Sequence, residues 1–133
     1  MSTAASAVSS GYGTKENPIV YRLQVDTSTK TVRVSMSPPR YHFDRGEYVK
    51  FDSNVHNAAI RFVSKKSPFY NDEITPHRGH PRPGEVFELG KDGRVCEVLC
   101  SKGMSRFECG YVENGIFETW PHGEGADTPG GGY

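Results

Sequence analysis

The sequence predicts an all-β protein, an antiparallel β-sandwich of seven or eight strands. Apolar residues recur at every second position in several short runs, which is the period of a half-buried strand. These runs are separated by Gly, Pro and Asn, the residues that favour turns. No stretch shows the spacing of apolar residues that is typical of an amphipathic helix. Short strands separated in this way favour two packed sheets or a barrel.

The chain of 133 residues is long enough for one domain with a sizeable core. Residues 1–17 are small and polar, and residues 123–133 are rich in glycine. Neither stretch carries enough apolar surface to offset the entropy lost on ordering. We therefore expect a flexible segment over 1–17, the sandwich domain over 18–122 and a flexible tail over 123–133.

The strand pattern is clearest near the start of this domain. Alternate residues of 19–25 and of 32–36 are apolar, and the polar connection 26–30 between them predicts a hairpin. The further strands that the pattern predicts are 47–52, 58–63, 85–89, 95–100, 107–112 and 116–120.

Two glycine-containing turns are expected later in the chain. Asn114-Gly115 is a strong signal for a two-residue hairpin, because both positions need positive φ. Lys102-Gly103 is a second hairpin candidate, and it would place Cys96 opposite Cys109 on one face of the sheet. A buried pair of thiols is the favoured outcome for these two cysteines, and a disulfide bond is the alternative.

The segment from Ser64 to Gly84 is long for a connection within a compact domain. It holds four prolines and two histidines, His77 and His80. Long irregular loops are often functional, although a surface excursion without a role is the other interpretation.

Charge and composition exclude several functional classes. Sixteen basic residues balance sixteen acidic ones, so we expect neither nucleic acid nor a membrane as a partner. The first residues lack a secretory signal, and three cysteines do not form a disulfide framework. The expected location is the cytoplasm, unless the protein is exported by a route that needs no signal.

The order of several motifs resembles the cupredoxin family, which includes plastocyanin and azurin. Gly46-Glu47 precedes a strand, and His56-Asn57 then opens the next strand. Pro83-Gly84-Glu85 begins another strand, and residues 93–100 look like the strand that ends in the family's cysteine. The resemblance covers residues 38–112 and implies a Greek-key β-sandwich.

The resemblance also implies copper ligands, and the set is incomplete. His56, Cys100 and Met104 occupy positions that resemble the histidine, cysteine and axial methionine of the family. A blue-copper centre needs two imidazoles and a thiolate, but Ser101-Lys102-Gly103 contains no histidine. His77 and His80 are the candidates to fill this gap. In an alternative register, Cys109 would be the family cysteine. That ligand set also lacks a second histidine, because none follows Cys109 over 110–119.

We expect a non-enzymatic, cupredoxin-like binding module without a working blue-copper site, whose partner is an unidentified protein or small ligand. The alternative is a copper-binding protein with a modified ligand set, serving electron transfer or copper handling. A third possibility is an enzyme with Cys100 as nucleophile, near Lys102, but no motif around Cys100 supports it.

Overall fold

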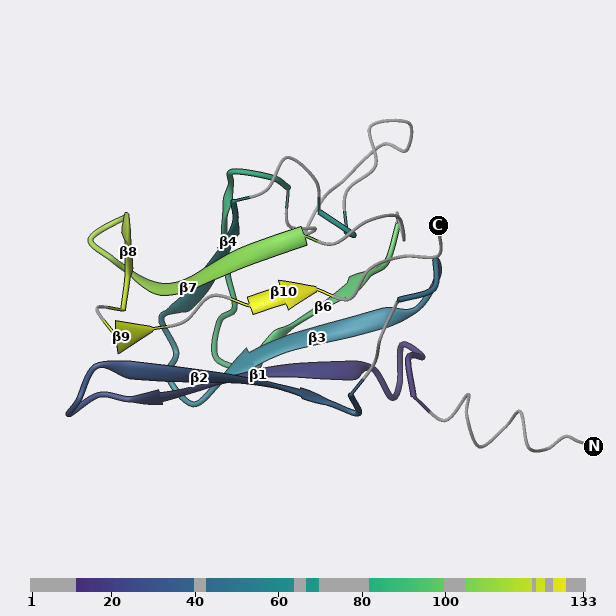
Figure 1. The fold of residues 1–133 in the computed structure, drawn as a ribbon, viewed down its shortest axis with the longest axis horizontal. Coiled ribbons are helices and arrows are strands. Elements are labelled where there is room, and N and C mark those ends of the chain that lie inside the picture. Colours follow the sequence, from purple (N-terminus) through teal and green to yellow (C-terminus); the bar gives the residue numbers. More distant parts are fainter. Residues whose placement is uncertain are drawn as a thin grey trace, which may run out of the picture.

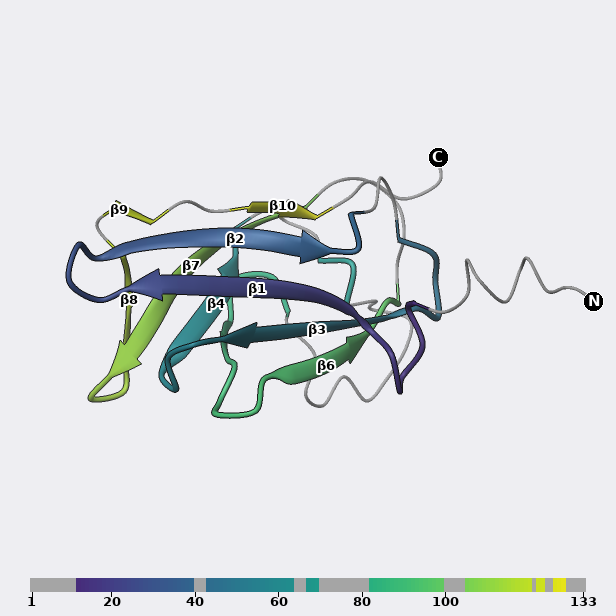
Figure 2. The same cartoon turned by 90° about the horizontal axis from the view of Figure 1, so that it is seen from below.

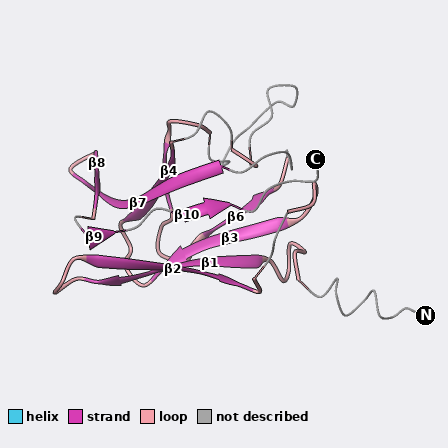
Figure 3. Cartoon of the chain, viewed as in Figure 1, coloured by secondary structure: helices cyan, strands magenta, loops and turns pink. Residues whose placement is uncertain are grey.

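The computed structural model describes residues 12–39, 43–63, 67–69, 82–99, 105–120, 122–123 and 126–128. These residues form ten strands and no helix, which confirms the all-β prediction (Figure 3). None of the described segments is an apolar helix of the length needed to cross a membrane. The strands are β1 (Ile19–Asp26), β2 (Thr31–Ser37), β3 (Tyr48–Ser53), β4 (Ala58–Phe62), β5 (Val86–Glu88), β6 (Arg94–Glu97), β7 (Ser105–Glu113), β8 (Ile116–Thr119), β9 (His122–Gly123) and β10 (Ala126–Thr128).

The strands form two sheets (Figure 1). The first sheet has the order β6-β3-β1-β2-β9, and the second has the order β10-β7-β4-β5 with β8 also paired to β7. The chain changes sheet after β3, β5, β6, β8 and β9. Each of β1 to β8 overlaps a strand predicted from alternating apolar residues.

Two predicted hairpins are confirmed. β1 and β2 pair antiparallel, and the side-chain oxygen of Asp26 accepts hydrogen bonds from the Ser28 hydroxyl at 2.7 Å and the Ser28 N–H at 3.0 Å. These bonds lower the pKa of Asp26. β7 and β8 pair through Glu113 and Ile116, and Asn114 and Gly115 between them have φ of 54° and 78°. Positive φ at both positions is typical of a type I′ turn.

The sequence predicted a purely antiparallel sandwich, but two of the strand pairs are parallel. β1 pairs parallel with β3, from Ile19 opposite Val49 to Leu23 opposite Ser53. The chain returns along β2 to the end where β1 began, so the crossover over 38–47 starts β3 there as well. β9 is also parallel to its neighbour β2.

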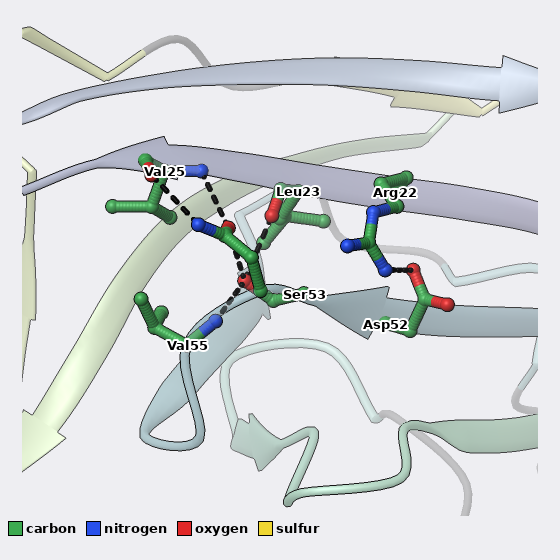
Figure 4. Close-up of polar contacts among 7 residues, drawn as sticks. Arg22, Leu23, Val25, Asp52, Ser53 and Val55 are labelled. Carbon is green, nitrogen blue, oxygen red and sulfur yellow. Dashed lines mark hydrogen bonds and ion pairs between the residues drawn. The ribbon is translucent and has the colours of Figure 1, made fainter.

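Side chains after β3 continue its pairing with β1 (Figure 4). Asn54 accepts a hydrogen bond from the Val25 N–H at 2.7 Å and donates one to the Val25 carbonyl at 2.8 Å. The Ser53 hydroxyl donates to the Leu23 carbonyl at 2.7 Å. These side chains satisfy backbone groups of β1 where the main chain of β3 has turned away.

Aromatic rings fill the space between the sheets. Tyr21 stacks on Phe51 with ring centroids 5.2 Å apart, and Phe107 packs edge-on against both rings. Phe69 and Phe62 complete this contact network at 5.5 to 6.0 Å. All five side chains are at most 2% exposed. Burial of side chains this large supplies much of the stability of a small domain.

β8 approaches β7 closely at Gly110. A Cβ at Gly110 would lie 2.9 Å from the Phe117 ring and would also collide with the Glu118 carbonyl group, so only glycine lets β8 approach β7 here. The Arg61 guanidinium lies 4.8 Å above the Phe117 ring and donates from Nε to Glu108 at 2.8 Å.

Main-chain hydrogen bonds and strand pairing also involve residues outside the expected domain 18–122. The Tyr48 N–H donates to the Gly13 carbonyl at 2.8 Å, which extends the edge of β3. β9 begins at the predicted domain end, and β10, within the expected tail, pairs with Ser105–Phe107 of β7. These contacts are made by main-chain groups, so small and polar side chains gave no signal for them.

Candidate functional site

The connections between strands gather at two ends of the sandwich (Figure 2). We call the end that holds the Asp26 hairpin, the turn 54–57 and the Asn114-Gly115 hairpin the turn end. We call the opposite end, where β3 begins and β6 ends, the loop end. The described residues that flank the connections 38–47, 63–85 and 98–104 lie there. The described length of β3 separates the two ends by about 17 Å.

His56 lies at the turn end. Its side chain is exposed, in the turn that joins β3 to β4. The next residue, Asn57, accepts a hydrogen bond at its carbonyl from the Val112 N–H at 3.0 Å. Within the described residues, no group of three or more His, Cys, Asp and Glu side chains is placed to hold a metal ion.

The strand that ends beside His56 is β7. Ala58 at the start of β4 pairs with Tyr111 of β7. The Tyr111 ring packs on Trp120 at 4.6 Å, and its hydroxyl donates to Glu118 at 3.1 Å, which raises the pKa of Tyr111. An aromatic pair therefore occupies this end of β7, beside the turn that holds His56.

The strand before Cys100 ends at the other pole. β6 runs antiparallel to β3, with Glu97 opposite Tyr48, and the Val98 carbonyl accepts from the Gly46 N–H at 2.9 Å. Leu99, the last described residue before Cys100, therefore lies at the loop end. The described strands do not bring this segment to His56, because antiparallel pairing carries β6 away from the end of β3. Cys100 itself lies outside the described residues.

One end of the long loop is anchored in the core at the loop end. Phe69 is 0% exposed, and its ring touches those of Phe51 and Phe62. The Pro68 carbonyl accepts from the Leu99 N–H at 2.8 Å, and Ser67 is also buried. Burial of the Phe69 ring therefore fixes this side of the loop to the core.

The other end of the loop is anchored to β4. Pro83 forms a bridge with Phe62, and the Gly84 N–H donates to the Phe62 carbonyl at 2.8 Å. Gly84 has a φ of 79°, which favours glycine at this bend. Residues 70–81 thus begin and end at positions that the fold holds in place.

Four of the five predicted ligands, His77, His80, Cys100 and Met104, lie outside the described residues. The described residues on either side of them share the loop end. These flanking residues are Phe69, Arg82, Leu99 and Ser105. Among the described residues, His56 is the one predicted ligand, and it lies at the turn end.

The predicted pairing of Cys96 with Cys109 across a hairpin is wrong. Cys96 lies in β6 opposite Val49, whereas Cys109 lies in β7 of the other sheet, opposite Ile60. The chain changes sheet between them, and Lys102-Gly103 lies outside the described residues. Both thiols are free and buried, as the favoured interpretation had it. Burial raises the pKa of each to about 12.

We expect Cys96 and Cys109 to resist alkylation in the folded protein. A thiol with a pKa of about 12 contains little thiolate at mildly alkaline pH, and burial also blocks the reagent. Mass spectrometry of peptides after iodoacetamide treatment measures this, with a urea-unfolded sample as the control in which both thiols react. Rapid native labelling of either residue would contradict the expected burial.

An open depression of about 590 Å³ lies at the turn end of the first sheet. Gln24 and Arg33 face each other across β1 and β2 beside it, and Asp26 closes one side. Sequence analysis did not find this feature, because the alternation of polar residues marks an outer face without showing where it is hollowed. The Asp26 carboxylate is already bonded within its own hairpin.

Comparison of the chain with protein-family models, curated proteins and solved structures gives no match. The cupredoxin resemblance therefore stays a prediction from the motifs and their order.

Proposed function

We propose that the protein is a non-enzymatic binding module that presents the loop 64–84 to a protein or small-ligand partner. The observation that carries this proposal is the anchoring of the loop on both sides, by buried Phe69 and by the Gly84 bond to β4. A loop held by a rigid scaffold loses less entropy on binding than a free segment does.

The strand arrangement supports a cupredoxin-like, Greek-key version of this scaffold. The chain passes from β3 in one sheet to β4 in the other, and His56 stands directly before β4. The resemblance implies a histidine at this position. Tyr111 and Trp120 at the end of β7 support the further proposal that no blue-copper centre forms beside His56.

The test replaces residues 70–81 with a short Gly-Ser linker, which leaves Phe69 and Gly84 in place. We expect cross-linking in cell extract to capture a partner with the natural loop and to lose it with the linker. His56→Ala is the matched control at the other end of the sandwich and should retain the partner. Equal capture by all three proteins, or loss only with His56→Ala, would argue against the loop as the contact surface.

A second candidate function is copper handling at the loop end. It is favoured by the described residues that flank the predicted ligands His77, His80, Cys100 and Met104, because these flanking residues lie at that end. A set of two imidazoles, a thiolate and a thioether suits copper(I), which accepts soft ligands.

Titration of the reduced protein with copper(I) against a competing chelator tests this function. We expect Cys100→Ser to abolish stoichiometric binding and His56→Ala to leave it unchanged, because His56 lies about 17 Å away along β3. Absence of stoichiometric binding in the natural protein would remove this candidate. Dependence of binding on His56 would instead favour the ligand set that the family resemblance implies.

A further inference from the structure

The hairpin between β7 and β8 carries a chemically labile pair of residues. Asn114 and Gly115 are both exposed, and a Cβ at Gly115 would meet nothing within 4 Å. Asparagine followed by glycine is prone to imide formation, because no side chain shields the glycine nitrogen. We infer that Asn114 is a site of spontaneous deamidation whose rate is set by the opening of β8.

The reaction needs no partner other than water. The Gly115 nitrogen loses its proton and forms a bond to the Asn114 Cγ, and the bond from Cγ to Nδ2 breaks as ammonia leaves. Water then opens the five-membered imide. Cleavage between Cγ and the Gly115 nitrogen gives aspartate, and cleavage at the main-chain carbonyl gives isoaspartate.

The native turn slows formation of the imide ring. Opening of β8, which is weakly attached, would allow the ring to form. Ring closure requires rotation about the bond between Cα and the carbonyl carbon of Asn114, away from the turn conformation with φ of 54°. β8 has four residues and pairs only with β7 among the described strands, and three of its four side chains are exposed. Segments with few buried contacts open at low free energy.

Other asparagines in the described fold are protected and serve as internal standards. The Asn54 side chain is held by two hydrogen bonds to Val25, and the residue after Asn54 is Val55. Asn57 is followed by Ala58, and its side-chain amide contacts the Val112 carbonyl at 3.5 Å. Asn17 precedes Pro18, whose nitrogen carries no proton to lose.

Deamidation alters the contacts that hold β8 against β7. Isoaspartate adds a main-chain carbon to a two-residue turn, so the pairing of Glu113 with Ile116 no longer fits. Phe117, which lies beneath the Arg61 guanidinium, would then lose its place over Gly110. Aspartate keeps the main-chain length and adds only a negative charge beside Glu113.

The experiment incubates the purified full chain at mildly alkaline pH and follows each asparagine by peptide mass spectrometry. Asn114 is expected to convert well before Asn54 and Asn57, with isoaspartate as one product. Phe117→Ala removes the ring beneath Arg61, and we expect it to raise the rate at Asn114 about two- to fivefold without changing the rate at Asn54.

Two results would overturn the inference. Conversion of Asn114 no faster than that of Asn54 would remove the modification site. An unchanged rate in Phe117→Ala would remove the control by β8. If that variant does not fold, the natural protein is incubated in low urea instead. Hydrogen exchange of the β8 amides and conversion of Asn114 should then rise together. Independent changes in the two rates would count against control of the reaction by β8.

Discussion

We expect the substitution Phe69→Ala to lower the free energy of unfolding by about 3–5 kcal/mol. The Phe69 ring is 0% exposed and packs against Phe51 and Phe62, with centroids 5.5 and 6.0 Å away, so truncation leaves a cavity between the sheets. Urea denaturation followed by near-ultraviolet circular dichroism measures the change.

Two matched variants separate the effect of the cavity from a general effect of substitution. Val63→Ala changes an apolar residue that is 53% exposed directly before the same loop, and we expect a change within about 0.5 kcal/mol. Phe69→Leu keeps much of the volume and should lie between the two. Equal stability of Phe69→Ala and Val63→Ala would show that Phe69 does not anchor the loop in solution.

This first result also bears on the proposed function. If the loop 64–84 binds a partner because Phe69 holds one side of it, Phe69→Ala should weaken binding even under conditions where the domain stays folded. Binding unchanged in the folded variant would place the contact surface elsewhere.

The second large effect is expected at Asn54. Asn54→Ala removes both side-chain hydrogen bonds to Val25, so a part-buried N–H and carbonyl lose their partners. We expect a loss of about 2–3 kcal/mol in unfolding free energy and faster hydrogen exchange of the Val25 amide. By comparison, the partly exposed Arg22–Asp52 ion pair beside it, at 3.3 Å without hydrogen-bond geometry, should contribute less.

Asn54→Asp tests the explanation in finer detail. The carboxylate can still accept from the Val25 N–H but cannot donate to the Val25 carbonyl, so an intermediate loss is expected. Ser35→Ala, an exposed position on β2, is the control for substitution in this sheet. A loss in Asn54→Ala no larger than that in Ser35→Ala would mean that water replaces both bonds.

Much of the fold could be predicted because its signals are local. Alternation of apolar residues marks β1 and β2 directly, since neighbouring side chains of a strand point to opposite faces. Asn114-Gly115 specifies its own hairpin, because few residues other than Asn and Gly tolerate positive φ. Burial of Cys96 and Cys109 also followed from their place on apolar strands.

The errors concern segments that are far apart in the chain. The hairpin expected around Lys102-Gly103 assumed that β6 and β7 share a sheet, but β6 pairs with β3 and β7 pairs with β4. The alternation of apolar residues shows that a strand has a buried face, but it does not show which strand pairs with it or which sheet it joins. The cupredoxin resemblance implied that the strand before Cys100 ends near His56, whereas β6 ends beside the start of β3.

The amino-acid order was sufficient for the class of fold, the position of β1 to β8 and the form of the hairpins, because each depends on residues within one strand or turn. Tertiary structure alone decided the parallel pairing of β1 with β3, the pairing of β10 with β7 and the burial of Phe69. It also decided that His56 lies at one end of the sandwich and the flanks of the long loop at the other. These properties depend on the pairing of distant strands, which is chosen by the packing of the whole core.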